Sequence, residues 1–322
     1  MIDHPPRNLG LDLVRVTEAA ALEAGRWMGL GKPYEADQQA GQAMHQALNT
    51  LDMEGRIVVG ERIKAGGSSP LSSGRRVGTG HGPEMDVVAD AIEGRNLLVQ
   101  GHPDAISVVG VAPRGSMWAP DPALYMDKIV VDREAAAALV PECIGAPTAW
   151  TLALVARVKD KPIRDLVVFV LNRPRHKYLI EEIRAAGARA MLRSDGDIAG
   201  ALMAAMPEIG VDLLMGVGGV SEGVISACAV KALGGGMLGC LAPQSEEEQV
   251  AVEEAGLDCA DVADCDHLVS SDEIFFAATG ITNGTVLRGV SYRGDTASTE
   301  SLVLRSQTGT RRFIRAEHRL PG

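Results

Sequence analysis

Two acidic residues, Asp90 and Glu93, follow the apolar run Val87-Val88-Ala89 and stand just before Gly94. A strand that delivers two carboxylates into one turn can direct both at a single cation, and Mg²⁺ and Mn²⁺ prefer oxygen ligands. The chain has 42 acidic residues, so a pair of solvated turn acids is the alternative interpretation. The spacing alone leaves both interpretations open.

A second candidate site is the glycine-rich run from Gly216 to Gly223, which lies between two apolar segments. Glycines at a strand-to-helix turn let the backbone approach an anion, and a helix N-terminus offers free N–H groups. The run does not match the dinucleotide-binding pattern, because Ser221 stands where the third glycine is required, and the Walker lysine is missing. A plain turn is the alternative.

Cationic side chains follow another apolar run, DLVVFVL (165–171), in the order Arg173, Pro174, Arg175 and His176. Ligands of open α/β sheets commonly bind beyond the ends of strands. Two guanidinium groups and an imidazole at such a position suit a phosphate. The alternative is a surface helix that begins at Pro174.

Two further carboxylates, Asp195 and Asp197, flank Gly196 after the short run RAMLR (189–193). Carboxylates at a strand end can accept hydrogen bonds from sugar hydroxyl groups. Taken alone, the segment is more typical of an acidic N-cap on the helix that follows.

The elements that must position these residues differ between the two halves of the chain. Apolar spacing predicts helices over 11–28 and 36–51, then strands in the runs EGRIVVGE (54–61), MDVVADAIEG (85–94), AISVVGVA (105–112) and DKIVVD (127–132). After residue 136, strands at 165–171, 189–193 and 211–217 alternate with helices at 148–158, 174–186, 198–206 and 221–233. This alternation predicts a parallel sheet covered by helices. Beyond the acidic run 246–248 and its helix, the runs FFAATGI, TVLRGVSY, TASTESLVLRS and RRFIRAEH predict strands.

Composition limits the classes of function. The 322-residue chain has a net charge of −11 and a pI near 5.2, which argues against a surface for a nucleic-acid backbone. No apolar run approaches the roughly 20 residues of a membrane helix, and the first residues do not resemble a signal peptide. The 5 cysteines form no CxxC pair, as expected for reduced thiols. We therefore expect a cytoplasmic protein with no nucleic-acid or membrane partner.

Taken in order, these segments resemble the class II fructose-1,6-bisphosphatase family, bacterial metal-dependent sugar bisphosphatases within the wider lithium-sensitive phosphatase group. The matching motifs run along nearly the whole chain: RVTE (15–18), AD (36–37), VGE (59–61), VGTG (77–80), DVVAD (86–90), IEG (92–94), YMDK (125–128), PRH (174–176), DGD (195–197), GG (218–219), EG (222–223) and ATGIT (278–282). One such motif would be weak, but this number in order indicates common ancestry.

The resemblance implies an α/β fold, the layered αβαβα sandwich of this group, with a mixed sheet in the first half. We expect a metal-binding phosphatase subdomain over residues 1–140 and a sugar-phosphate-binding α/β subdomain over 141–322. The family's metal-binding carboxylates fall on Asp37, Glu61, Asp90, Glu93 and Glu222. Its sugar-phosphate contacts fall on Glu93, Gly94, Tyr125, Arg173, Pro174, Arg175, Asp195, Gly196, Asp197 and Gly219, with His176 and Arg95 beside them.

Three departures separate this chain from the family pattern. Arg95 stands where the family usually has the threonine that helps to position the attacking water, and the run 61–67 loses three acidic residues and gains Arg62 and Lys64. The family's lysine in the run before Asp37 is also missing. Either the site is adapted to another sugar phosphate, with Arg62, Lys64 or Arg95 meeting an extra negative charge, or hydrolysis is weak and the chain mainly binds a sugar phosphate.

Persistence of the matching carboxylates favours retained phosphatase activity. The resemblance implies that water activated by Mg²⁺ or Mn²⁺ attacks the 1-phosphate of fructose 1,6-bisphosphate or a related ketose bisphosphate. Glu61, Asp90, Glu93 and Arg95 are then the catalytic residues, and Arg175 binds the remote phosphate. Sedoheptulose 1,7-bisphosphate or a sugar phosphate of a specialised pathway are alternative substrates. We also expect a dimer or tetramer, with the helix 221–233 as a subunit contact.

Overall fold

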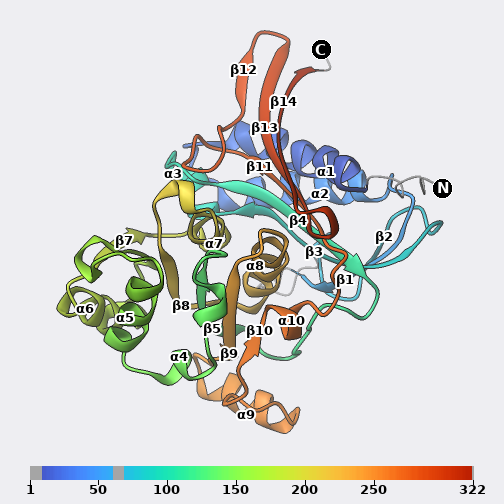
Figure 1. The fold of residues 1–322 in the computed structure, drawn as a ribbon. Coiled ribbons are helices and arrows are strands. Elements are labelled where there is room, and N and C mark those ends of the chain that lie inside the picture. The colour runs from blue at the N-terminus through green and yellow to red at the C-terminus, as the bar shows by residue number, and fades with distance from the viewer. Residues whose placement is uncertain (1–8, 61–68, 321–322) are drawn as a thin grey trace, which may run out of the picture.

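The computed structural model describes residues 9–60 and 69–320, which form two β-sheets separated and covered by helices (Figure 1). The helices are α1 (Leu9–Ala24), α2 (Pro33–Leu48), α3 (Arg95–Gln100), α4 (Glu142–Gly145), α5 (Thr148–Val158), α6 (Lys177–Ala185), α7 (Asp197–Ala205), α8 (Val220–Ala232), α9 (Glu246–Glu254) and α10 (Cys265–Leu268). Short 3₁₀ turns include η1 (Gly25–Trp27) and η4 (Pro174–His176). No helix of these ranges is long and apolar enough to cross a membrane.

The first sheet combines strands from both ends of the chain, in the order β12-β13-β11-β4-β3-β1-β2, with β14 on the free side of β13. Its strands are β1 (Glu54–Val59), β2 (Arg76–Val77), β3 (Glu84–Glu93), β4 (Ile106–Pro113), β11 (Phe275–Gly280), β12 (Ser291–Arg293), β13 (Thr296–Arg305) and β14 (Thr310–Arg319). The pair β1–β3 is parallel and the other pairs are antiparallel. The predicted mixed sheet is therefore confirmed.

The second sheet has the order β10-β9-β5-β8-β6-β7. Its strands are β5 (Tyr125–Val131), β6 (Val167–Leu171), β7 (Arg189–Arg193), β8 (Leu213–Gly219), β9 (Gly236–Leu241) and β10 (Ala263–Asp264). The strands predicted from the β/α alternation, β6, β7 and β8, are parallel. The alternation did not predict the antiparallel part of this sheet, because β5 enters from the first half of the chain and runs antiparallel to both β8 and β9.

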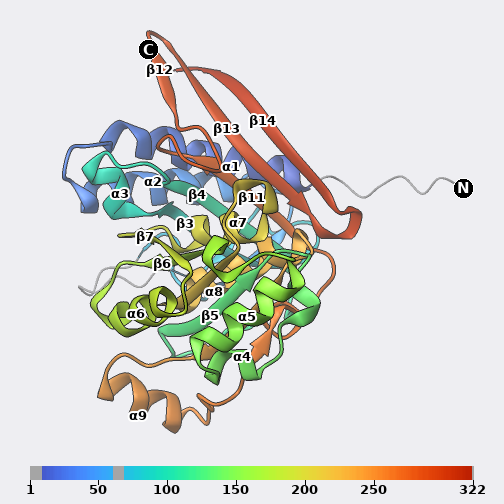
Figure 2. The same ribbon diagram turned by 60° about the vertical axis from the view of Figure 1, so that its left-hand side comes forward.

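Five layers follow one another: helices α1 and α2, the first sheet, helices α7 and α8, the second sheet, and helices α4 to α6 (Figure 2). Alternate residues of β3 serve different cores, because successive side chains of a strand point to opposite faces. Val87 and Ala89 pack towards α1 and α2, whereas Val88 packs towards α8. The expected αβαβα sandwich is therefore confirmed.

The two central helices lack a solvent-facing side. Every residue of α7 is buried, and so are most residues of α8. A helix that is apolar all round belongs in a protein core. The expectation that the segment 221–233 contacts a partner subunit is therefore wrong, because that helix is enclosed between the sheets of its own chain.

Neither sheet is built from one side of residue 140. Strand β5 belongs to the second sheet although it precedes this residue, and β11 to β14 belong to the first sheet although they follow it. The division expected at residue 140 consequently does not coincide with the division between the sheets.

Several predicted ends move by a few residues. Helix α1 ends at Ala24 and gives way to η1, and α2 begins at Pro33, which stands at the first helical position and needs no N–H partner there. The predicted strand over 285–292 is present only as β12.

Candidate active site

Glu93, the last residue of β3, is a carboxylate enclosed by protein. Its side chain is 3% exposed, and its Oε1 accepts a hydrogen bond of 3.0 Å from the backbone N–H of Ile198. Its Oε2 is buried and has no hydrogen-bond partner among the described residues. Burial, reinforced by the charges of Asp195 and Asp90, raises the pKa of Glu93 well above its usual range. A buried carboxylate oxygen without a partner is destabilised unless a cation or a proton binds to it.

Asp90 lies on the same strand but on the other side of an irregularity. In the β3–β4 pair, Asp90 lies opposite Val108 and Glu93 lies opposite Ile106, so β3 carries an extra residue. Such a bulge changes the direction in which a side chain points. Asp90 is partly exposed, and its Oδ1 accepts a hydrogen bond of 2.9 Å from the N–H of Ile92. The bulge therefore lets two nearby carboxylates of one strand lie in different surroundings.

Arg95 begins α3 directly after Gly94, whose φ of +82° is a left-handed conformation that favours glycine. The Arg95 Nη1 forms an ion pair with Asp37 Oδ2 from the first turns of α2. Burial raises the pKa of Asp37, although the contact with Arg95 opposes this effect. Asp37, which the sequence predicts to be a metal ligand, therefore forms an ion pair with the guanidinium of Arg95 in the structure.

Asp195 links the ends of β3 and β6. Its Oδ2 accepts a hydrogen bond of 3.2 Å from the N–H of Asn96, and its Oδ1 lies 3.5 Å from Arg173 Nη2. Arg173 and Asp195 were both predicted to contact the substrate, and the structure places them together at the edge of the second sheet.

Arg175 faces strands β5 and β8. Its guanidinium donates to the carbonyl of Val217 through Nε at 3.1 Å and Nη2 at 2.8 Å. The same group lies over the ring of Tyr125, 5.4 Å from its centre. Arg175 is exposed, so the carbonyl and the ring hold a cation at the surface where it can meet an anion.

His176 is buried and has both ring nitrogens engaged. Nδ1 lies 2.7 Å from the carbonyl of Leu171, and Nε2 accepts a hydrogen bond of 2.8 Å from the N–H of Val217. This pattern requires a neutral ring with the proton on Nδ1. Burial also lowers the pKa of His176. In this arrangement neither nitrogen is available to a phosphate, and the ring instead positions the backbone next to Arg175.

Lys128 is a site residue to which the sequence analysis gave no role. The side chain is wholly buried on β5, and its Nζ lies 2.5 Å from Asp197 Oδ2 at the start of α7. Asp197, predicted to read sugar hydroxyls, therefore has a lysine partner. The signal available in the sequence was a lysine within the apolar run DKIVVD, since a buried lysine requires a paired acid.

The remaining predicted residues lie at helix starts. Gly196 and Gly219 are the N-caps of α7 and α8, and Pro174 opens η4. Glu222 lies in the first turn of α8, where its Oε2 accepts a hydrogen bond of 2.8 Å from Ser221 Oγ. Glu61, with the altered run that follows it, lies outside the described residues.

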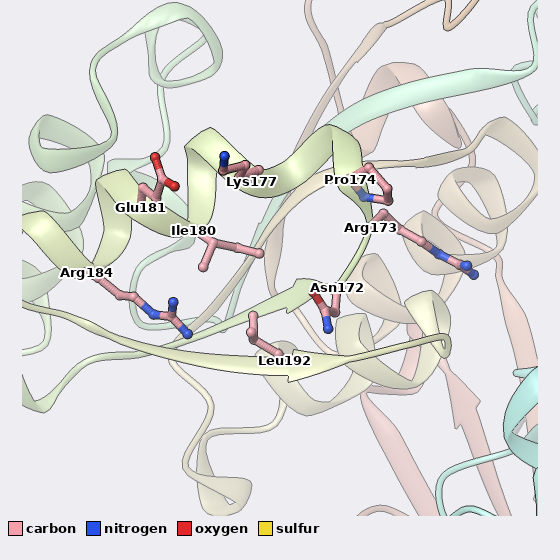
Figure 3. A pocket seen from close by; sticks show the side chains of 8 residues that line it. All are labelled: Asn172, Arg173, Pro174, Lys177, Ile180, Glu181, Arg184 and Leu192. Carbon is pink, nitrogen blue, oxygen red and sulfur yellow. The ribbon is translucent and has the colours of Figure 1, made fainter.

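A cavity of about 530 Å³ adjoins this region, between α6 and the ends of β6 and β7 (Figure 3). Its walls include Arg173 and Pro174 together with the basic Lys177 and Arg184. None of the predicted metal-binding carboxylates lines it. Figure 3 shows the Arg173 side chain extending away from Leu192 and Ile180, so the cavity lies beside the candidate site instead of over it.

The donor set fits a divalent ion at Glu93 but not at Asp37. Glu93 Oε2 is an unpaired oxygen donor with acidic neighbours, which suits Mg²⁺ or Mn²⁺. Asp37 is paired with Arg95. Within residues 9–60 and 69–320, no three or more acidic, histidine or cysteine side chains are gathered closely enough to hold a metal ion by themselves.

Comparisons with known proteins agree on one family. Residues 7–318 match the sequence model described as bacterial fructose-1,6-bisphosphatase, glpX-encoded. A Synechococcus protein (strain JA-2-3B'a(2-13)) named D-fructose 1,6-bisphosphatase class 2/sedoheptulose 1,7-bisphosphatase is 38% identical over 341 aligned positions, covering 98% of this chain and 96% of the relative. A Haemophilus influenzae protein named fructose-1,6-bisphosphatase class 2 is 36% identical over 328 positions, covering 98% and 97%.

Proposed function

This chain belongs to the bacterial glpX-encoded fructose-1,6-bisphosphatase family of metal-dependent phosphatases, and we propose that with Mg²⁺ or Mn²⁺ it hydrolyses the 1-phosphate of a ketose bisphosphate, fructose 1,6-bisphosphate first of all. As a member of this family the chain is a phosphoric monoester hydrolase. The observation that carries the metal-dependent reaction is the buried Oε2 of Glu93, which has no hydrogen-bond partner among the described residues and lies near the charges of Asp90 and Asp195.

In the proposal, Asp90, Glu93, Glu222 and Glu61 hold the ion, while Asp37, the fifth carboxylate that matches the family's set, is paired with Arg95. A bound divalent ion makes water more acidic and offsets negative charge on the transferring phosphoryl group. Glu93 is fixed by the N–H of Ile198, so its free oxygen keeps one direction. Arg95 adds a further positive charge next to these carboxylates. Such fixed charge stabilises a transition state without having to rearrange during the reaction.

The same proposal assigns the remaining contacts to the sugar and its second phosphate. Arg175, supported by Tyr125 and Val217, binds the non-reacting phosphate, with Arg173 nearby. Gly94, Pro174, Gly196 and Gly219 supply backbone at the turns around it. Asp195 and Asp197 accept hydrogen bonds from hydroxyl groups, and His176 holds the backbone on which Arg175 rests.

Phosphate release from fructose 1,6-bisphosphate, sedoheptulose 1,7-bisphosphate and the corresponding monophosphates tests the proposal, with Mg²⁺, Mn²⁺ or a chelator added separately. We expect release only with a divalent ion, and loss of most turnover in Glu93→Gln, because the amide keeps the shape without the charge. The exposed Glu247→Gln on α9 is the matched control. Near-parent turnover of Glu93→Gln at limiting metal would contradict the metal assignment. Tight calorimetric binding of the bisphosphate without release over hours would instead indicate a binding protein.

An Arg175→Ala variant in the same panel tests the position of the second phosphate. A charge-assisted hydrogen bond contributes about 1.5–3 kcal/mol, or roughly ten- to a hundredfold. We expect the variant to lose that factor in kcat/KM for bisphosphates but not for monophosphates, and we expect the exposed neighbour Lys177→Ala to lose neither. Equal losses on both substrate classes would place Arg175 elsewhere.

The proposal also covers the compartment and the assembly. A sugar with two phosphates is strongly charged and does not cross a membrane unaided, so we place the reaction in the cytoplasm. Association into a dimer or tetramer is proposed through the edge strand β14, which pairs with β13 and with no other described strand and exposes half of Phe313. Sedimentation of the purified protein measures this state directly.

A further inference from the structure

We infer that the guanidinium of Arg95 takes the place of one divalent ion in the acidic cluster, so that this chain binds one metal ion fewer than its carboxylates would otherwise hold. The inference rests on the proposed function, in which Asp37 is the one carboxylate of the family's metal-binding set that is paired with Arg95 instead of the ion. It assigns to Arg95 a role in metal stoichiometry, separate from any contact with the substrate.

The first support is the direct contact between Arg95 and Asp37. Helix α2 supplies Asp37 and the start of α3 supplies Arg95, and these two helices pack against each other. The Arg95 Nη1 meets Asp37 Oδ2 as an ion pair with a hydrogen bond. The charge of a carboxylate that is paired with a guanidinium is already neutralised, so that carboxylate binds a metal ion more weakly.

The second support is the number of acids around the same guanidinium. Burial alone would lower the pKa of Arg95, but the hydrogen bond and the charge of Asp37, together with the charges of Asp90 and Asp195, outweigh burial and raise it. The guanidinium of Arg95 therefore lies within the field of carboxylates that come from α2, β3 and the turn before α7, where Asp195 also meets Arg173.

The third support is the contrast between Asp37 and Glu93. Glu93 Oε2 is buried without a hydrogen-bond partner among the described residues, whereas Asp37 Oδ2 has its partner in Arg95. Both carboxylates match the family's metal-binding set. Of the two, Glu93 has an oxygen without a partner among the described residues, so an added cation would stabilise Glu93 more than Asp37.

A guanidinium and a divalent ion are not equivalent in this position. Arginine carries one permanent positive charge in a planar fork that matches a carboxylate, but it offers no open position to a water molecule. Arg95 can thus gather the acids of α2 and β3, while an ion held by Glu93 would supply the activation of water. The side chain is 52% exposed, so it can be changed without opening the core.

Equilibrium dialysis of the full chain against Mn²⁺ tests the inference, with the bound metal measured per chain. We expect Arg95→Met to bind one more Mn²⁺ than the parent protein. Adding Asp37→Asn to Arg95→Met should abolish this extra ion, while Asp37→Asn alone leaves the parent stoichiometry unchanged. Arg157→Met, an exposed arginine of α5, is the matched control.

The thermal midpoint gives a second readout that does not depend on turnover. Because an ion that binds only the folded state stabilises it by mass action, Mn²⁺ should raise the midpoint more in Arg95→Met than in the parent. Equal stoichiometry and equal midpoint shifts in both proteins would overturn the inference and leave the proposed phosphatase reaction intact. If neither the parent nor any variant bound Mn²⁺, and phosphate release did not depend on added metal, both the proposed metal dependence and the inference would be contradicted.

Discussion

At the scale of single residues, Gly218 is the position on which the buried Lys128–Asp197 pair depends. A Cβ placed on Gly218 would lie 1.8 Å from Asp197 Oδ2 and 2.4 Å from Lys128 Nζ. Both charged partners are buried and have no solvent into which they can move. The strand β8 therefore approaches the pair closely because it has no side chain there.

We expect Gly218→Ala to lower the free energy of unfolding by about 3–5 kcal/mol, the range found when a buried ion pair is broken. Denaturant unfolding measures the change. Gly145→Ala is the control, because beyond its own helix backbone and chain neighbours no described atom lies within 4 Å of the added carbon. A loss below about 1 kcal/mol would mean that the pair can shift without cost.

His176 gives the protein a predictable response to acid. Burial lowers its pKa below the usual 6.5, and the charge of Arg175 acts in the same direction. The unfolded chain therefore takes up this proton first as the pH falls. The contribution to stability is complete above pH 6.5 and is lost as the pH falls through the lowered pKa of the folded state.

Chemical unfolding at several pH values between 5 and 8 checks this prediction. We expect His176→Phe to be less stable than the parent but to lose less of its stability between the two ends of the range. The exposed His102→Phe should keep the parent's slope. An unchanged slope in His176→Phe would show that another group causes the acid response.

At the scale of elements, α9 is anchored to the candidate site by one acid of an otherwise exposed run. Ser245 caps the helix by accepting a hydrogen bond of 3.2 Å from the N–H of Glu248. Glu248 is buried, and its Oε1 accepts from the N–H of Leu124 at 2.7 Å and of Tyr125 at 3.0 Å. The carboxylate thus fixes the start of β5, where Tyr125 meets Arg175.

For Glu248→Ala we expect a higher KM for the bisphosphate with a smaller change in kcat, because the start of β5 loosens while the carboxylates of β3 stay in place. The lost charge-assisted hydrogen bonds should also lower stability by about 1.5–3 kcal/mol. Steady-state kinetics and unfolding measure the two effects. Glu247→Ala, an exposed neighbour, should show neither, and a fall in kcat alone would argue against this positioning role.

Local sequence signals predicted most elements but not the neighbours of each strand. The apolar runs of β6, β7 and β8, separated by helices, sufficed to predict their parallel pairing. Strand β5 has an equally clear apolar run, yet periodicity carries no information about direction or partner. Its antiparallel place between β8 and β9 depends on contacts between distant parts of the chain.

In the candidate site, too, some residues could be predicted from the sequence, whereas the contacts between distant residues could not. Strand ends followed by polar residues pointed to Glu93, Asp195 and Arg175, because the end of a strand places a side chain at the edge of a sheet. The Lys128–Asp197 pair depends on β5 and α7 meeting in the core, and the Arg95–Asp37 pair depends on α2 packing beside α3. Neither meeting can be predicted from residue spacing.

At the scale of the whole molecule, each of the two sheets contains strands from both the first and the second half of the chain. Strand β11 lies between β4 and β13, so the first sheet is completed by the last part of the chain. Strand β5 lies between β8 and β9, so the second sheet requires a strand that precedes residue 140. The core between the sheets draws on both halves as well.

We therefore expect the fragments 1–140 and 141–322, each made alone, to show no cooperative unfolding transition. Each would expose a sheet edge and an apolar face that the other half covers in the intact chain. Near-ultraviolet circular dichroism during denaturation, with the intact chain as the control, measures this. Cooperative unfolding of either fragment alone would show that one half folds without the other.

The burial of α8 between the sheets also sets a time scale. Amide hydrogens exchange with solvent through local opening where a segment touches water, and only through global unfolding where it does not. Because α8 is enclosed by both sheets, its amides belong to the slowest class, whereas α2 and α3 lie in an outer region that can open locally. We therefore expect the helix that carries Glu222 to exchange only through global unfolding, and the helices that carry Asp37 and Arg95 to exchange earlier, through local opening.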